Sequence, residues 1–239
     1  MAIKTETIKH EHAGQSLHGM LAVDEAAPKP LPAVIISHAW AGRGQFECDK
    51  AKRLAELGYV GFAADLYGEA KVGGSTEENS KLMQPFLEDR PHLQSRLASV
   101  VETVKGLDGV DANRVAAIGF CFGGLCVLDL ARTGADVRGV VSFHGLLGAP
   151  GNTSGSDIKA KILVLHGHDD PMVPVEQVVG LEKELTEAGA DWQIHTYGGA
   201  MHAFTHPEAN DPGMGTVYEP KADRRSWQSL VNFLEEVFD

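Results

Sequence analysis

The fold is decided by residues 114–131, which have the sequence RVAAIGFCFGGLCVLDLA. Arg114–Ile118 is predicted to form a short buried strand, and Phe122–Ala131, which is apolar on nearly every face, a buried helix. The turn between them, GFCFGG at positions 119–124, matches the Gly-x-Ser-x-Gly pattern of a nucleophile elbow, with Cys121 in the place of serine. This succession of strand, turn and helix predicts an α/β protein with a nucleophile at the end of a buried strand.

The spacing of the glycines around Cys121 has a steric reason. A nucleophile elbow is a strained turn, so the residues two positions before and after the nucleophile must lack side chains to let the strand and the helix approach. Gly119 and Gly123 meet this requirement, and Gly124 adds further room. A thiol at a helix N-terminus also lies at the positive end of the helix dipole, which favours the thiolate. Cys121 is therefore the predicted nucleophile; the alternative is a glycine-rich turn that carries a buried cysteine.

The rest of the chain alternates short apolar runs with longer amphipathic stretches. Strands that are apolar on both faces and are separated by helices predict a mostly parallel sheet covered on both faces, a three-layer α/β fold. Thr5–His10 and Ser16–Val23 alternate in polarity and predict an antiparallel hairpin at a sheet edge. Further strands are predicted over Ala33–Ser37, Tyr59–Ala64, Val137–Phe143, Lys161–His166 and Trp192–Tyr197. Helices are predicted over Cys48–Leu57, Lys81–Lys105 with a break near Pro91, Val175–Ala188 and Lys221–Val237, and a loop over Gly68–Ser80.

Composition and charge narrow the class of protein. The chain has 239 residues, of which 43% are apolar and 23% charged, and we expect one folded domain over residues 1–239. A formal net charge of −12 disfavours binding to nucleic acids and to anionic membranes. No stretch approaches the ~18 apolar residues of a membrane span, and the N-terminal segment lacks the apolar core of a secretory signal. Three cysteines without framework spacing fit a reducing compartment, so we expect a cytoplasmic protein.

A thiol nucleophile needs a base and a carboxylate that orients the base. In this architecture the three groups follow along the chain as nucleophile, acid and histidine. Asp169 and Asp170 follow the predicted strand Lys161–His166; we choose Asp170 as the acid because the prolines after it fix the turn, with Asp169 as the alternative. The histidine is expected after the next strand, where two glycines precede His202 and allow its loop to bend; His206 is a weaker candidate. These positions lie at the carboxyl ends of parallel strands, where such sheets place their chemistry.

An acyl-transfer site also needs two donors for the oxyanion of its tetrahedral intermediate. One predicted donor is the backbone N–H of Phe122, the residue after the nucleophile. The second is expected from the loop at positions 38–44, which follows the predicted strand Ala33–Ser37. We assign it to the backbone N–H of Trp40, with Ala39 as the alternative if the register differs by one residue.

These motifs resemble the dienelactone hydrolase family, a minimal branch of the α/β-hydrolases. The resemblance is carried by GFCFGG, by HDDPMVP at 168–174 and by MHAF at 201–204, and it covers nearly the whole chain. It implies a single α/β-hydrolase domain without a separate lid, with Cys121, Asp170 and His202 as a catalytic triad and no metal or other cofactor. It further implies a small ester or lactone substrate and a monomeric protein.

The sequence departs from the family pattern in two places. The type enzymes carry a glutamate where this chain has Ala39, and an arginine shortly after the catalytic histidine, where this chain has Phe204-Thr205-His206. Without the glutamate, the thiol should pair directly with the histidine, and both changes weaken the case for a dienelactone substrate. A neutral, apolar pocket predicts neutral aryl or short-acyl esters, and a soft thiolate adds phosphotriesters with good leaving groups as a promiscuous class. The predicted pocket residues are Ala39, Trp40, Arg43, Phe122, Met201 and Phe204, with Leu146 and Leu147 as further candidates.

Two alternative functions stay open. The segment His166-Gly167-His168-Asp169-Asp170 matches the His-x-His-x-Asp core of zinc hydrolases, although Pro171 stands where those families add a histidine. A redox sensor or binding module would instead use Cys121 as an oxidisable thiol, with Cys126 as a resolving partner in poor disulfide geometry. The roles of four further histidines are not assigned: His38, His144, His166 and His168.

Overall fold

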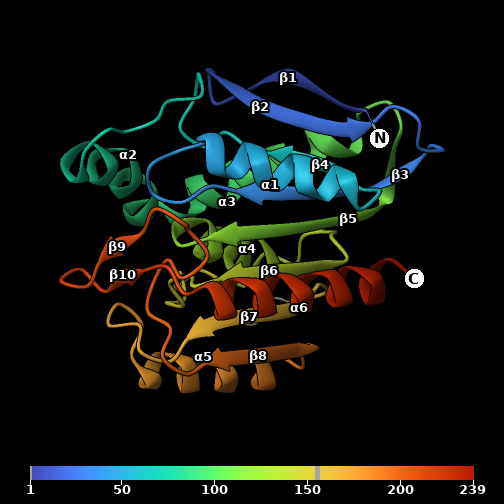
Figure 1. Ribbon diagram of the computed structural model, residues 1–239. Helices are drawn as coiled ribbons and strands as arrows, with labels where there is room; N and C mark the ends of the chain where they lie inside the picture. The colour runs from blue at the N-terminus through green and yellow to red at the C-terminus, as the bar shows by residue number, and fades with distance from the viewer. Residues whose placement is uncertain (1, 154–156) are drawn as a thin grey trace. The chain divides into compact units, whose positions relative to one another are not determined.

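The computed structural model describes residues 2–153 and 157–239 and confirms the predicted α/β fold. Eight strands form one mostly parallel sheet in the order β1-β2-β4-β3-β5-β6-β7-β8, and β9 and β10 form a small separate sheet (Figure 1). Residue contacts divide the chain into two compact units, Met1–Ile118 and Gly119–Asp239. No helix in the described part of the chain combines the length and the apolar character needed to span a bilayer.

The first unit begins with the predicted antiparallel hairpin, which is confirmed. Strand β1 (Ile3–His12) pairs with β2 (Gln15–Asp24) along its whole length, and β1 lies at the edge of the sheet. Strand β3 (Leu31–Ser37) is buried at every residue and pairs in parallel with β4 (Val60–Ala63). Burial on both faces explains why these two segments are continuous apolar runs.

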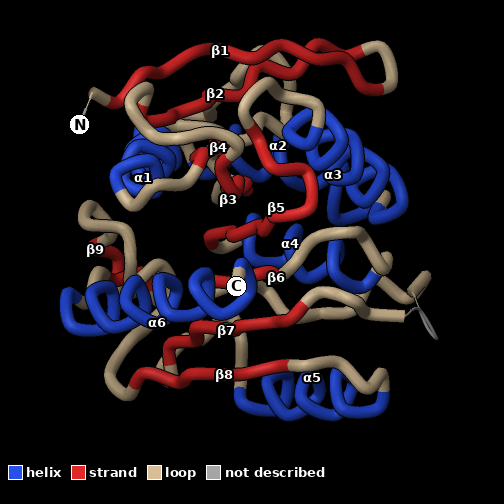
Figure 2. Tube along the Cα trace, turned by 90° about the vertical axis from the view of Figure 1, so that its right-hand side faces the viewer, coloured by secondary structure: helices blue, strands red, loops and turns tan. Residues whose placement is uncertain are grey.

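Helices cover both faces of the strands in the first unit, with α1 and α3 on opposite sides (Figure 2). Helix α1 (Gln45–Glu56) packs so closely on β4 that a side chain at Gly61 would lie 2.2 Å from the carbonyl oxygen of Ala51. Helices α2 (Thr76–Glu88) and α3 (Arg90–Lys105) meet at Asp89, close to the predicted break.

The predicted loop Gly68–Ser80 is wrong over its last five residues, because α2 begins at Thr76. The hydroxyl of Ser75 accepts a hydrogen bond from the backbone N–H of Glu78 and caps the helix. This cap, rather than the glycine-rich composition, determines where the helix starts.

The second unit contains the predicted buried helix and three parallel strands. Strand β5 (Val110–Phe120) ends in it, and α4 (Phe122–Arg132) follows with every residue buried, as predicted. Strands β6 (Gly139–Phe143), β7 (Lys161–Gly167) and β8 (Trp192–Tyr197) pair in parallel, in the order of the chain.

Two helices cover opposite faces of β6. On one face, a side chain at Gly139 of β6 would lie 2.8 Å from Phe233 of α6 (Pro220–Phe238). On the other face, a side chain at Gly124 of α4 would lie 2.6 Å from the hydroxyl of Ser142 in β6. Residues three apart in a strand point to opposite faces, so α4 and α6 sandwich this strand (Figure 2). Helix α5 (Val175–Glu187) and the small strands β9 (Asn210–Asp211) and β10 (Thr216–Val217) complete the unit; β9 and β10 were not predicted.

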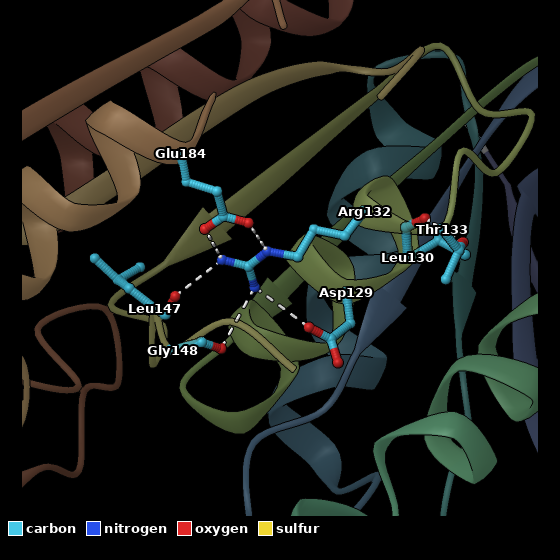
Figure 3. Close-up of polar contacts among 7 residues, drawn as sticks. All are labelled: Asp129, Leu130, Arg132, Thr133, Leu147, Gly148 and Glu184. Carbon is cyan, nitrogen blue, oxygen red and sulfur yellow. Dashed lines mark hydrogen bonds and ion pairs between the residues drawn. The ribbon is translucent and has the colours of Figure 1, made fainter. Parts of the chain in front are cut away.

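A buried arginine ties three segments of the second unit together (Figure 3). Arg132, at the end of α4, is 2% exposed, and its Nε and Nη2 donate to the carboxylate of Glu184 in α5 at 2.7 and 2.8 Å. Its Nη1 also donates to Asp129 at 3.3 Å. The carbonyl oxygens of Leu147 and Gly148 accept from Nη2 and Nη1 at 3.0 and 3.5 Å. Two carboxylates and two carbonyls therefore compensate this buried charge.

Candidate active site

Cys121 lies on a strained turn between β5 and α4. Its backbone has φ 55° and ψ −115°, in a region that side-chain-bearing residues seldom adopt, and its thiol is partly exposed. A side chain at Gly119 would lie 1.9 Å from the carbonyl oxygen of Gly123, and one at Gly124 would lie 2.6 Å from the Cα of Gly145. The turn thus needs its glycines for the reason inferred from the sequence. It is held to β6 by the N–H of Cys121, which donates to the carbonyl of Phe143 at 3.0 Å.

The structure brings Asp170 and His202 together. Oδ2 of Asp170 lies 2.8 Å from Nδ1 of His202, and both residues are nearly fully buried. The other carboxylate oxygen of Asp170 accepts from the N–H of Met172 at 2.8 Å, which fixes the acid within its turn. Asp169 is exposed, and its N–H donates to the carbonyl of Ala200. Of the two candidate acids, Asp170 is therefore the partner of His202.

The small β9–β10 hairpin holds the loop that carries His202. The carbonyl of His202 accepts from the N–H of Val217 at 3.1 Å, and His202 forms a parallel bridge with Thr216. Gly215 in the same hairpin packs on Pro171, where a side chain would lie 2.1 Å from the proline ring. The hairpin thereby touches both the histidine loop and the turn that carries the acid.

The electrostatics of His202 mark it as part of a charged pair. Burial lowers the pKa of His202, but the negative charge of Cys121, the hydrogen bond that His202 donates to Asp170 and a hydrogen bond with Cys121 raise this pKa to about 10. Because Nδ1 is engaged by Asp170, the interaction with Cys121 uses the other ring nitrogen, Nε2. That nitrogen is buried and has no partner of standard hydrogen-bond geometry among the described residues. The raised pKa favours the protonated imidazole of His202 at neutral pH.

The predicted oxyanion loop lies in the first unit. Glu47, which is 3% exposed, accepts from the N–H groups of Ala39 and Gly44 at 3.2 and 2.9 Å, and burial raises the pKa of its carboxyl. Trp40 is half-buried, and its carbonyl accepts from the hydroxyl of Tyr67 at 2.9 Å. The N–H of Ala39, the alternative to Trp40 as the predicted oxyanion donor of this loop, is thus already engaged by Glu47. Nothing in the sequence pattern pointed to the role of Glu47.

Other predicted site residues differ in exposure. Phe122, the first residue of α4, and Phe204 have fully buried side chains, whereas Met201 is half-buried. The backbone N–H groups of a first helical turn have no acceptor within the helix, which suits Phe122 to the role of a backbone donor. Leu146 is half-buried and Leu147 is 3% exposed. Arg43, in the first unit, donates from Nη1 to the sulfur of Cys48 at 3.2 Å.

The segment that resembles a zinc site is not arranged as one. His166 is 4% exposed, whereas His168 and Asp169 point to solvent and Asp170 binds His202. Burial, together with the neighbouring imidazoles of His168 and His202, lowers the pKa of His166 more than Asp170 raises it. No group of three His, Cys, Asp or Glu side chains in residues 2–153 and 157–239 is placed to hold a metal ion. Cys48, Cys121 and Cys126 form no disulfide with one another, and Cys126 is fully buried.

A second histidine, His144, borders His202. It directly follows β6, is 2% exposed, and its ring packs edge-on against that of His202 with 5.2 Å between centroids. Its Nε2 lies 2.8 Å from the hydroxyl of Thr205. Its position after a buried strand was the one signal in the sequence, and it did not define a role.

Comparison with known proteins identifies the family. The sequence profile of the dienelactone hydrolase family matches residues 17–238. The chain belongs to the dienelactone hydrolase family. It is therefore an enzyme, a hydrolase of the α/β-hydrolase fold, as the motifs around Cys121, Asp170 and His202 implied.

Individual relatives of this dienelactone hydrolase family member cover most or all of the chain. A putative carboxymethylenebutenolidase of Aquifex aeolicus is 29% identical over 96% of this chain and 97% of its own. An uncharacterized protein of Caenorhabditis elegans is 37% identical over 61% of this chain and 94% of its own. The crystal structure of a dienelactone hydrolase-like promiscuous phosphotriesterase from metagenomic libraries is similar with a TM-score of 0.94, at 34% identity and full coverage of both chains.

Proposed function

We propose that the protein hydrolyses activated carboxylic esters or lactones with Cys121 as nucleophile, His202 as acid and base, and Asp170 as the group that orients His202. The proposal rests on one observation: Nδ1 of the buried His202 lies 2.8 Å from Oδ2 of Asp170, and the charge of Cys121 and this hydrogen bond raise the pKa of His202. A histidine that holds a proton beside a thiolate supplies a nucleophile and a proton donor at the same time.

The reaction follows from these positions. The thiolate sulfur of Cys121 bonds to the carbonyl carbon, and the electron pair of the carbonyl moves onto its oxygen. The backbone N–H of Phe122 donates to this oxyanion, and such a donor contributes ~3–4 kcal/mol to transition-state stabilisation. As the intermediate collapses, Nε2 of His202 gives its proton to the departing alcohol, leaving a thioester and a neutral imidazole.

The second half of the reaction regenerates the enzyme. The neutral imidazole of His202 takes a proton from water, whose oxygen bonds to the thioester carbon. The acid product leaves and the thiolate of Cys121 returns, again paired with the imidazolium. Throughout, the carboxylate of Asp170 accepts the Nδ1–H of His202, which keeps Nε2 available for proton transfer.

The substrate class follows from the residues that this chain lacks. Ala39 and the segment Phe204-Thr205-His206 stand where the family pattern has its glutamate and its arginine, so neutral aryl or short-acyl esters are the favoured class. Phosphotriesters with good leaving groups form a promiscuous second class, because a thiolate attacks phosphorus as well as carbon. Similarity to a protein described as a promiscuous phosphotriesterase supports this second class. Within the proposal, Trp40 supplies the second oxyanion donor.

The protein as a whole is proposed to act as one domain and as a cytoplasmic monomer, with no nucleic-acid or membrane partner. Three cysteines that form no disulfide support a reducing compartment. The net charge of −12 supports a small-molecule substrate over a polyanionic partner.

The test is turnover of para-nitrophenyl acetate and of paraoxon by the wild type and by Cys121→Ala. We expect Cys121→Ala to lose at least ~10³-fold in kcat on the ester, because the variant lacks the sulfur that forms the proposed acyl intermediate. Cys126→Ala is the matched control, because it removes a fully buried thiol from the same helix; it should retain activity. Ester hydrolysis that survives Cys121→Ala, or that a metal chelator abolishes, would overturn the proposal.

A further inference from the structure

His144 links the nucleophile elbow, strand β7 and the histidine loop. Its own N–H donates to the carbonyl of Leu165 at 2.8 Å. The preceding residue, Phe143, accepts from the N–H of Cys121 at 3.0 Å. The His144 side chain then reaches Thr205, 61 residues further along the chain, at 2.8 Å. One residue thus connects the backbone that fixes the nucleophile to the loop that presents His202.

The contact between the His144 and His202 rings restricts a motion that Asp170 alone leaves free. A single hydrogen bond at Nδ1 lets an imidazole tilt about that bond, and tilting would swing Nε2 away from Cys121. The His144 ring lies against His202 at 5.2 Å with an interplanar angle of 64°. It also packs at 80° against Phe204, two residues further along the same loop, with 5.1 Å between centroids. The rings are close-packed, so a tilt of His202 would displace His144.

The backbone of His144 carries the strain that this position requires. Its φ is 38°, a left-handed value that costs free energy for a residue with a side chain. The strain persists at a residue that is 2% exposed and hydrogen-bonded to Thr205, itself 1% exposed. Such strain is retained where the surrounding contacts over-determine the conformation, which is common beside reacting groups.

We propose that His144 is a positioning residue for the proposed reaction: through Thr205 and its ring contact, it holds the imidazole of His202 with Nε2 directed at Cys121. This inference rests on the proposed function, because it assigns His144 a role in the same site. The role of His144 can be tested separately from the proposed function, because the rate of Cys121 alkylation reports the thiolate–imidazolium pair without any substrate.

The test compares His144→Phe, Thr205→Val and the double variant. His144→Phe keeps a flat ring and removes the nitrogen, whereas Thr205→Val keeps the shape and removes the hydroxyl. We expect each single variant to lower both kcat on para-nitrophenyl acetate and the rate of Cys121 alkylation by iodoacetamide by about tenfold, with KM within about twofold, because a small misplacement of a reacting group is costly. The double variant should lose no more than either single one, because the two residues act through one hydrogen bond.

A matched control is available in the same unit. Nδ1 of His195 in β8 lies 3.1 Å from the hydroxyl of Ser229 in α6. This is also a contact between a histidine and a hydroxyl, but it does not involve His202. His195→Phe should leave kcat and the alkylation rate unchanged. The inference is overturned if Thr205→Val keeps both rates within about twofold of the wild type, or if the losses of the two single variants multiply in the double variant. Thr205→Val keeps the test decisive if His144→Phe does not fold. Failure of Cys121→Ala to abolish turnover would overturn the proposed function and not this packing relation.

Discussion

The second unit contains two buried charge clusters that differ in how completely their polar atoms are satisfied. Around Arg132, the three guanidinium nitrogens donate to Asp129, Glu184 and two backbone carbonyls (Figure 3). Around His202, Nδ1 is bonded to Asp170, but Nε2 is buried and has no partner of standard geometry among the described residues. The Arg132 cluster is closed within itself, whereas the His202 cluster extends to the side chain of Cys121.

The comparison shows why burial of charge alone does not identify an active site. A buried charge is tolerated when hydrogen bonds and counter-charges replace its lost hydration, and the Arg132 cluster meets this condition fully. At His202 the raised pKa depends on Cys121, a group with nucleophilic chemistry on a strained turn. A proton donor beside a proposed nucleophile is the feature that makes the His202 cluster, and not the Arg132 cluster, the candidate active site.

The largest expected effect is on the His202 cluster. Asp170→Asn keeps the shape of the acid but removes its charge, and the amide can then present a donor to Nδ1 of His202 and favour the wrong tautomer. We expect kcat on para-nitrophenyl acetate to fall by about 10²–10⁴-fold, as when the orienting acid of a triad is neutralised. Steady-state kinetics measure this loss, and a melting temperature close to that of the wild type would show that the fold is intact. Wild-type kcat in Asp170→Asn would contradict the assigned role.

Breaking the Arg132 cluster should lower the stability of the protein and leave its turnover intact, the opposite of what we expect for Asp170→Asn. Arg132→Met removes the cation from beside Asp129 and Glu184, so we expect the free energy of unfolding to fall by about 3–5 kcal/mol, the usual cost of removing one partner of a buried pair. Urea denaturation measures this change. Turnover per folded molecule should stay near the wild-type value at temperatures well below unfolding.

A double variant sharpens this result. Asp129→Asn combined with Arg132→Met removes a carboxylate together with the cation, so it should be more stable than Arg132→Met alone. A large loss of kcat in folded Arg132→Met would instead make the arginine part of the reaction and would remove the distinction between the two clusters.

Features of the two clusters that lie close together along the chain could be predicted from the sequence, whereas contacts between distant residues could not. The elbow was predictable because its glycines, its strand and its helix are adjacent along the chain, and the steric rule acts over six residues. The sequence places the candidate acid before the candidate histidine and favours Asp170 over Asp169 through the prolines after it, but only the structure shows the 2.8 Å contact between Asp170 and His202.

Contacts between distant residues had no local signal. Arg132 and Glu184 are 52 residues apart, and His144 and Thr205 are 61 residues apart, so no spacing rule connects them. The start of α2 was missed for another reason: the cap formed by Ser75 is a single hydrogen bond inside a segment whose composition is typical of a loop. Side-chain packing decided these features, whereas backbone sterics and hydrophobic period decided the fold.

A titration of His202 tests whether the charge of Cys121 is what raises the pKa of this histidine. The pKa of His202 is about 10, above the ordinary 6.5, so its proton is held through neutral pH and lost only as pH rises through about 10. Cys121→Ser removes the thiolate charge that raises this pKa, so the imidazole should lose its proton at a lower pH. Side-chain NMR of histidine-labelled protein measures both curves, and Cys126→Ser serves as the control. Identical His202 titrations in the wild type and Cys121→Ser would separate the histidine from the thiol.

The smallest effect on activity is expected at Asp169, which directly precedes Asp170 in the sequence. Asp169 carries the same carboxylate as its neighbour and lies on the same turn, but its side chain is exposed and it contributes to the loop through its backbone N–H. Asp169→Asn keeps that N–H, so kcat/KM should change by less than about twofold, as for most surface substitutions. The pair Asp169→Asn and Asp170→Asn therefore compares one chemical change at two positions that differ in burial and in contact with His202. If Asp169→Asn proved as damaging as Asp170→Asn, the negative charge of the turn as a whole, rather than the hydrogen bond to Nδ1, would support the imidazolium.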